Sequence, residues 1–374
     1  MINFWSYSDE YKTLKTKMLK KIDLSIKSGK IFFGPELDNF EKKFIKINKF
    51  KYGAAVGSGT DAIYISLLAL GIGPGDEVIT VSNTAIPTAS AITSSGAKIK
   101  YVDIKNDYLI NSDQIQKKIT KKTKAIMVVH LFGQAVDMDL VMNIAKKYNL
   151  KVIEDCAQST GAMHKKKKSG SFGDVGCFSF YPTKILGAYG DAGFLSTNNI
   201  NLYNKMKRIR SMGMENNIKS KSKFNKKYYA IEHGTNSRLD EIQASILNVK
   251  LNYIKSYIKR RREIAKKYNK NLKKGKLAIP LEASNNFHVY YQYVVAHSNR
   301  DKIIHKLLKK NISLGITYPY PVHEMKPYKR FFNKKYEKLS KTKHFSKQIF
   351  SLPTYPSIKD SDVEKIIKEI NKLI

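Results

Sequence analysis

The sequence predicts an α/β protein with a mostly parallel central sheet and a smaller C-terminal α+β domain. Between residues 77 and 154, short runs rich in Ile and Val alternate with amphipathic helical patterns, which is typical of βα units and of a parallel sheet. The 374 residues are enough for one large and one small domain, each with its own core. We place the large domain, with an N-terminal helical segment, at residues 1–245 and the smaller domain at residues 246–374.

The N-terminal part predicts two helices and then a phosphate-binding turn. Residues 8–30 show a helical pattern, and a turn at 32–36 separates them from an amphipathic helix at 37–44. Val56-Gly-Ser-Gly-Thr-Asp61 then precedes an apolar helical run at 62–70. A Gly-rich turn before a helix presents free N–H groups and the positive end of the helix dipole, which suits a phosphate. An ordinary strand-to-helix turn capped by Thr60 or Asp61 is the alternative.

The alternating region ends at an acidic residue. We expect strands at residues 77–81, 98–102, 125–129 and 151–154, and helices at 87–94, 112–119 and 138–148. Ligands of such sheets gather at the carboxyl ends of the strands. Asp155 follows the last of these strands, so it is a candidate for the site.

A lysine after a later strand completes a recognisable pair. Lys184 stands in a Gly-studded loop that follows a strand-like run at 176–180. A lysine amine that forms a Schiff base with an aldehyde, and a carboxylate that keeps a pyridine nitrogen protonated, are the pair that pyridoxal 5′-phosphate (PLP) chemistry needs. Taken singly, an abundant Lys is usually a surface residue and an Asp after a strand is usually a cap or turn residue.

The residues around this pair decide between these readings. Ser179-Phe-Tyr-Pro-Thr-Lys184 with Leu186-Gly-Ala-Tyr-Gly-Asp-Ala-Gly193, and Glu154-Asp-Cys-Ala-Gln158 with Gly173-Asp-Val-Gly-Cys-Phe-Ser-Phe180, closely resemble the DegT/DnrJ/EryC1/StrS family of sugar aminotransferases. Several motifs agree in type, order and spacing. The resemblance implies a type I, aspartate aminotransferase-like fold with PLP as cofactor.

The resemblance also assigns roles to individual residues. Lys184 would hold the cofactor and move protons, and Asp155 would support the pyridinium. The cofactor phosphate would be bound by Gly59, Thr60 and Ser179. Gln158 would bind the ring hydroxyl or pack on the ring face.

A third motif, His233-Gly-Thr-Asn-Ser-Arg-Leu-Asp-Glu-Ile-Gln243, implies a homodimer with shared active sites. In the family, its Asn, here Asn236, reaches the phosphate in the neighbouring subunit. For Arg238 we favour an ion pair with Asp240 over a contact with the donor carboxylate. Ala85 stands where the family commonly has an aromatic residue that stacks on the cofactor ring, so what covers the ring here is open.

The C-terminal half shows fewer motifs. We expect a helix at 202–212, a charged surface loop at 215–227, a long helix at about 239–268, a strand at 289–295 and a helix at 300–310. Tyr318-Pro-Tyr-Pro-Val-His323 resembles the family loop that helps hold the nucleotide-sugar, which makes Tyr318 and His323 candidate substrate contacts. Packing is an equally good reading of this Pro-rich loop.

The charge first suggests a nucleic-acid partner. The formal net charge is +37, but only eight of the 68 basic residues are Arg, and Lys is spread over the whole chain. Base-edge recognition relies on Arg, so we expect no specific nucleic acid and keep a basic regulatory protein with an aminotransferase fold as the alternative. We predict an exposed turn at 165–168 and a solvent-facing helix surface at 260–262.

Other features of the sequence indicate the location of the protein and the state of its cysteines. Cys156 and Cys177 lie in apolar surroundings and read as reduced packing residues. The N-terminus lacks a signal-peptide pattern and no apolar run reaches the roughly 20 residues of a membrane span. We therefore expect a cytoplasmic protein without membrane contact, and no metal site.

The implied reaction moves an amino group from L-glutamate to a nucleotide-linked keto-deoxysugar. A lysine at position 184 favours amino transfer over the dehydratase branch of the family, which has a histidine there. The motif forms favour C3 of a dTDP-3-keto-6-deoxyhexose. Amino transfer to C4 of a UDP- or GDP-4-keto-6-deoxyhexose is the alternative.

Overall fold

The computed structural model of the protein describes residues 1–215, 229–273, 275–334 and 337–374. The surface loop predicted at residues 215–227 therefore lies outside the described residues, apart from its first position. Within the described ranges, no helix is both long enough and apolar enough to cross a bilayer.

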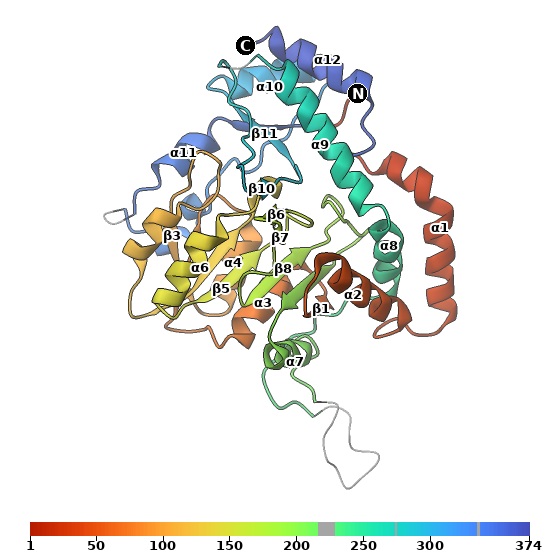
Figure 1. Ribbon diagram of the computed structural model, residues 1–374, viewed down its shortest axis with the longest axis vertical. Helices are drawn as coiled ribbons and strands as arrows, with labels where there is room; N and C mark the ends of the chain where they lie inside the picture. Colours follow the sequence, from red (N-terminus) through yellow and green to blue (C-terminus); the bar gives the residue numbers. More distant parts are fainter. Residues whose placement is uncertain (216–228, 274, 335–336) are drawn as a thin grey trace.

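A seven-stranded sheet forms the centre of the molecule (Figure 1). The strand order is β1-β9-β8-β5-β4-β2-β3, and only β9 runs against its neighbours β8 and β1. This confirms the predicted mostly parallel sheet. Its strands are β1 (Tyr52–Val56), β2 (Glu77–Val81), β3 (Lys98–Val102), β4 (Thr123–Val129), β5 (Lys151–Asp155), β8 (Val175–Ser179) and β9 (Gly193–Thr197).

Helices cover both faces of this sheet (Figure 1). Successive strand residues point to opposite faces, so Val78 and Ile153 pack in one apolar cluster, whereas Ile79 and Val152 pack in another. Burial on both faces explains why these strands read as continuous apolar runs. The helices between residues 1 and 251 are α1 (Ser8–Lys27), which packs on α8, α2 (Pro35–Asn48), α3 (Gly59–Ala69), α4 (Ile86–Ser94), α5 (Ser112–Ile115), α6 (Met138–Lys147), α7 (Ile200–Ile209) and α8 (Glu241–Leu251), with 3-10 turns η1 (Gln116–Lys118) and η2 (Leu131–Gly133).

The C-terminal part has its own apolar core, to which the N-terminus contributes. Ile2 pairs with Ile312 and packs among buried side chains of the helices at the top of Figure 1. The elements are α9 (Ile254–Asn271), α10 (Arg300–Leu308), α11 (Ser340–Ser346), α12 (Asp360–Asn371), β11 (Tyr293–Ala296) paired with β12 (Ile349–Leu352), and 3-10 turns η3 (Val322–Glu324) and η4 (Lys329–Phe331). A small sheet joins β10 (Asn286–Phe287) to β6 (Met163–His164) and β7 (Lys167–Lys168).

The boundary predicted between residues 245 and 246 falls inside helix α8. Leu247 and Leu251 of this helix share a core with Phe40 of α2, whereas Ile264 is the first residue of α9 in the C-terminal core. The two-domain division stays a prediction.

Two predicted elements are shorter than expected. The helix predicted at 239–268 is two helices, α8 and α9, interrupted at Asn252 and Tyr253. Ile254 and Ile258 continue in the core that holds α8, so the apolar periodicity hides the break. The strand predicted at 289–295 begins only at Tyr293, because the N–H groups of Val289 and Gln292 donate to carbonyls of Gly133 and Phe132.

The predicted roles of the basic clusters are partly wrong. Lys165 and Lys166 form the exposed turn between β6 and β7, as predicted. Arg261, predicted on a solvent-facing helix surface, is instead buried, and its Nη1 donates to the carbonyls of Tyr291 and Thr354. Burial lowers the pKa of its guanidinium to about 10. Both cysteines are buried and free, which confirms the reduced reading.

Candidate active site

Asp155 is buried at the carboxyl end of β5. Its Oδ2 accepts a hydrogen bond from Thr88 Oγ1 at 2.9 Å and its Oδ1 accepts one from Ala157 N at 3.1 Å. Both donors are neutral, and burial raises the pKa of the Asp155 carboxyl above its ordinary value. A cation that binds beside this carboxyl favours its ionised form.

Lys184 lies in the loop between β8 and β9. Its Nζ is 4.9 Å from the centre of the Tyr291 ring, and it makes no ion pair with an acid among the described residues. Burial raises the pKa of Asp155, and the positive charge of Lys184 offsets a small part of this effect. The amine is therefore not committed to a structural ion pair.

The turn before α3 leaves backbone donors free. Ser58, rather than Thr60 or Asp61, caps this helix: its hydroxyl accepts from Asp61 N at 3.1 Å. Helix geometry leaves the N–H groups of Gly59 and Thr60 without intrahelical acceptors. A methyl group on Gly59 would lie 2.6 Å from Ser179 Cβ, so the turn and Ser179 approach closely only because residue 59 is Gly. These three predicted phosphate ligands are thus neighbours.

Gln158 and Tyr318 meet although 160 residues separate them. The Gln158 side chain accepts from Phe132 N at 2.7 Å and donates to the Tyr318 hydroxyl at 2.8 Å. Both ends of the amide are thereby held, which leaves its flat face as the part free to contact a ring. Burial raises the pKa of Tyr318, with smaller contributions from Tyr291 and Asp155.

His323 takes a different position. It is 1% exposed, its Nδ1 lies 2.6 Å from Ser82 Oγ, and its ring packs 4.5 Å from that of Phe332. Burial lowers its pKa to about 4, so the ring is neutral at physiological pH. This geometry gives His323 a packing role and offers a substrate no free surface of the ring.

The third motif packs against the phosphate turn. Asn236 is exposed, whereas the hydroxyl of the next residue, Ser237, accepts from Gly57 N at 2.9 Å and donates to Asp61 Oδ2 at 2.8 Å. The predicted ion pair between Arg238 and Asp240 is wrong. The guanidinium of Arg238 instead lies 4.6 Å from the centre of the Phe32 ring.

The predicted partner, Asp240, has another role. It caps α8 by accepting from Gln243 N at 2.8 Å.

Ala85 is the N-cap residue of α4 and makes no capping hydrogen bond. Its side chain is a methyl group, so it offers no aromatic surface to a cofactor ring.

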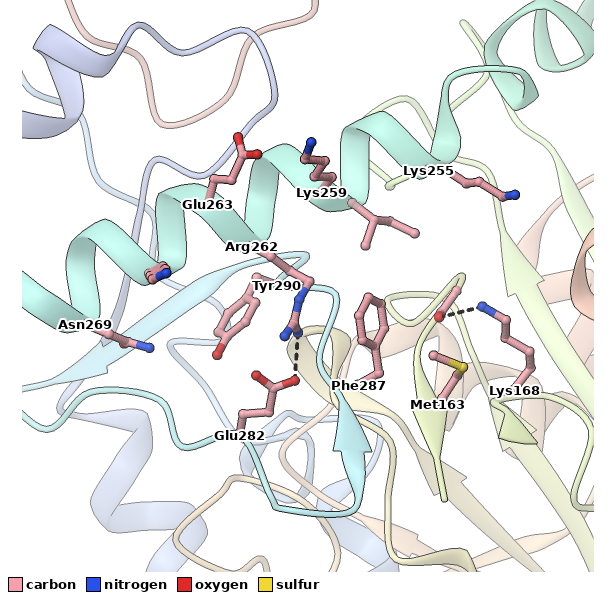
Figure 2. Close-up of a pocket in the computed structure, with 13 residues that line it drawn as sticks. Met163, Lys168, Lys255, Lys259, Arg262, Glu263, Asn269, Glu282, Phe287 and Tyr290 are labelled. Atoms are coloured by element: carbon pink, nitrogen blue, oxygen red, sulfur yellow. Dashed lines mark hydrogen bonds and ion pairs between the residues drawn. The ribbon is translucent and has the colours of Figure 1, made fainter. Parts of the chain in front are cut away.

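Two openings lie near these residues. A cavity of about 220 Å³ is lined by Lys184 and by Trp5, Tyr7, Glu10 and Tyr355, so the N-terminal segment and the C-terminal part both reach Lys184. Lys184 is the one predicted cofactor residue in its lining. A larger groove of about 650 Å³ lies under α9 (Figure 2). It is lined by Lys168, Lys255, Lys259, Arg262, Lys266, Phe287 and Tyr290, and by none of the predicted cofactor residues.

Sequence reasoning missed several supporting residues. Thr88 binds the Asp155 carboxylate, Tyr291 faces Lys184, and Ser237 joins the third motif to the phosphate turn. The sequence could have indicated Thr88, because it lies in the helix after β2, which begins at the same edge of the sheet as Asp155. Nothing in the sequence pairs Tyr291 with Lys184.

The arrangement fits PLP. Free N–H groups at the start of α3 suit its phosphate, the buried Asp155 suits a protonated ring nitrogen, and the unpaired Lys184 suits its aldehyde. The site thus offers chemical groups that match the phosphate, the ring nitrogen and the aldehyde of the cofactor.

Comparison with known proteins agrees with this geometry. The model of the DegT/DnrJ/EryC1/StrS aminotransferase family matches residues 12–371. The chain is 38% identical over 377 residues to the dTDP-3-amino-3,4,6-trideoxy-alpha-D-glucose transaminase of Micromonospora megalomicea subsp. nigra, covering 99% of this chain and 98% of the relative. It is 40% identical over 349 residues to the dTDP-3-amino-3,6-dideoxy-alpha-D-galactopyranose transaminase of Aneurinibacillus thermoaerophilus, covering 93% and 92%.

A solved structure shows the same fold. The crystal structure of S. venezuelae DesV in complex with a ketimine intermediate superimposes with a TM-score of 0.92 at 31% identity, covering 100% of this chain and 98% of that chain. The type I aminotransferase fold predicted from the motifs is therefore confirmed. The chain belongs to the DegT/DnrJ/EryC1/StrS aminotransferase family and is a PLP-dependent aminotransferase.

Proposed function

We propose that this enzyme transfers an amino group from L-glutamate to C3 of a dTDP-linked 3-keto-6-deoxyhexose. The observation that carries the proposal is the identity of 38% and 40%, over nearly the whole chain, to two relatives named as transaminases of dTDP-3-amino sugars. The free amine of Lys184 beside the buried Asp155 supports the amino transfer itself.

The residues divide the work as follows. Lys184 would hold the cofactor aldehyde, and its amine would move a proton to and from the reacting carbon as general acid and base. Asp155 keeps the ring nitrogen protonated, and Gly59, Thr60 and Ser179 hold the phosphate. When bound, PLP supplies an electron-withdrawing ring that stabilises negative charge on the amine-bearing carbon.

Two further residues orient the reactants in this proposal. Gln158 presents its amide face to the cofactor ring, because Phe132 and Tyr318 hold its polar atoms. Tyr318, whose hydroxyl accepts from Gln158, is the remaining candidate for a sugar contact. The buried position of His323 argues for an indirect role, in which it fixes the Tyr318 loop to Ser82 at the end of β2.

The experiment that tests the substrate is NMR analysis of glutamate-dependent amination across a panel of ketosugars. The panel contains dTDP-3-keto-, dTDP-4-keto-, UDP-4-keto- and GDP-4-keto-6-deoxyhexoses. We expect kcat/KM for the dTDP-3-keto sugar to exceed the others by at least about tenfold, a difference of about 1.4 kcal/mol in transition-state binding. Preferential amination at C4, or of a UDP or GDP sugar, would overturn this choice of substrate and leave the aminotransferase activity standing.

We also propose that the enzyme is a homodimer whose subunits share each active site through Asn236. The exposure of Asn236 supports this, because its side chain is available to a second copy. Asn236→Ala is expected to weaken PLP retention by about 10- to 100-fold, the usual cost of a hydrogen bond to a charged group. Mixed dimers of a Lys184→Ala chain and an Asn236→Ala chain should recover one intact site per dimer.

The reciprocal mixture is the control. At a PLP concentration that loads the wild type but not Asn236→Ala, a chain that carries both changes, paired with a wild-type chain, leaves every shared site with one lesion and should be inactive. If the sites are not shared, the outcomes exchange: the first mixture stays inactive and the second keeps the wild-type site.

A further inference from the structure

Three potential metal ligands meet beside the start of α6, away from the predicted cofactor residues. Asp137 immediately precedes this helix, Asp139 lies in its first turn, and His164 comes from β6. Their ligand atoms all lie within 4.8 Å of one another. His164 Nε2 is 3.5 Å from Asp137 Oδ1 and 3.6 Å from Asp139 Oδ2.

The fold orients the His164 ring toward the two carboxylates. Met163 lines the groove in Figure 2, and the next residue of a strand points to the opposite side. His164 Nδ1 lies 2.8 Å from Asn286 Oδ1, and the orientation of this amide is set because its Nδ2 donates to Ala135 O at 2.7 Å. An amide oxygen only accepts, so Nδ1 carries the hydrogen and Nε2 of the neutral ring presents its lone pair.

No group of the described residues donates a hydrogen bond to this lone pair. His164 is 4% exposed, and its Nε2 is buried without a hydrogen bond. Orienting a histidine through its other nitrogen is the usual second contact of a metal-binding imidazole. A buried nitrogen that faces two carboxylate oxygens points to a cation between them.

The two carboxylates are only partly used by the local fold. Asp137 occupies the N-cap position of α6 but makes no capping hydrogen bond. Asp139 contacts the ammonium of Lys165, which holds the pKa of that carboxyl below its usual range. Both side chains are about half exposed, so water can complete a coordination shell from the solvent side.

A second cluster of similar composition shows the contrast. His130, Glu154 and Cys156 also lie together, fully buried. There the nitrogens are occupied: His130 Nδ1 accepts from Val136 N at 3.0 Å and Nε2 lies 2.9 Å from Glu154 Oε2. Glu154 accepts three further backbone N–H groups, so this cluster is satisfied without an ion.

We propose that Asp137, Asp139 and His164 bind a divalent transition-metal ion of the zinc type. One imidazole nitrogen and two carboxylate oxygens, with water in the open position, are ligands that Zn²⁺ accepts in tetrahedral geometry. Metal–ligand bonds of about 2.0–2.1 Å place tetrahedral ligands about 3.3–3.4 Å apart, near the separations found here. The ion would fasten α6 to β6 and, through Asn286, to β10, close to the loop whose Phe132 holds Gln158.

The test is Zn²⁺ titration of the untagged PLP-loaded enzyme in competition with a chromophoric chelator. We expect one tight site per chain, and the visible absorption of tetrahedral Co²⁺ when that ion replaces zinc. His164→Gln, Asp137→Asn and Asp139→Asn should each weaken binding by at least about tenfold, and Asn286→Ala by about 10- to 100-fold, as other losses of an orienting contact do.

Two further variants distinguish zinc binding at this site from nonspecific zinc binding to surface histidines. Lys165→Met removes the cation that competes for Asp139 and should tighten binding. His305→Gln removes an exposed histidine of α10 and should change nothing. The absence of a tight site in the wild type, or equal zinc affinity in His164→Gln, overturns the proposal, whichever sugar the enzyme uses.

Discussion

Lys184→Ala is expected to lower kcat for glutamate-dependent amination by about 10³-fold or more. The substitution removes both the amine that holds the cofactor and the group that moves the proton, and each of these roles alone contributes orders of magnitude. Lys250, the other lysine that lines the cavity of Lys184, is paired with Glu10 at 2.8 Å and is therefore not a free replacement amine. Product formation measured by NMR checks the expectation.

Matched variants separate loss of chemistry from loss of charge or fold. Lys184→Arg keeps the cation near Tyr291 but cannot give up its proton at neutral pH, so it should be as inactive as the alanine variant. Lys259→Ala, on the exposed face of α9, should retain full activity. Borohydride treatment should add the cofactor mass at residue 184 of the wild type only. Turnover near the wild-type level in Lys184→Ala would contradict the assignment.

The parts of this fold that a sequence reveals are those governed by local rules. The strand at 77–81 agrees with the prediction because a buried parallel strand is a short, nearly continuous apolar run bounded by turn residues. The strand at 98–102, at the edge of the sheet, also agrees, and there Lys98 and Lys100 alternate with buried apolar residues. The phosphate turn is likewise local, because a Gly-rich segment and the helix after it are contiguous. Asp155 and Lys184 could be identified from the sequence because each lies within a continuous motif of the family.

What the sequence conceals is contact between distant segments. Gln158 and Tyr318 are 160 residues apart, and only the folded chain shows that each holds the other. His323 resembles a substrate residue in sequence, yet its ring bonds to Ser82, 241 positions away. Arg238 does not pair with Asp240, which is only two positions away in the sequence. Its guanidinium instead lies against the ring of Phe32, which comes from the turn after α1.

Asp155→Asn is expected to lower kcat by about 10²- to 10³-fold while stabilising the cofactor-free protein. An amide of the same shape cannot hold the proton on the ring nitrogen, so a preorganised charge that stabilises the transition state is lost. Thr88→Val, which keeps the carboxylate and removes one of its donors, should cause a smaller loss. Asp113→Asn, at an exposed position in α5, is the control and should be silent. Equal activity of Asp155→Asn and the wild type would exclude the proposed role.

The effect on stability follows from the direction of the pKa shift. Burial raises the pKa of Asp155 in the folded protein above its unfolded value of about 3.9. Folding therefore favours the protonated carboxyl, and this contribution is present below that value and is lost as the pH rises through the folded pKa. The apo wild type should unfold at a lower temperature than apo Asp155→Asn at neutral pH, with the difference shrinking toward pH 4. PLP should reverse the order, because the pyridinium stabilises the ionised carboxylate in the wild type alone, and thermal unfolding of both proteins with and without PLP measures this reversal.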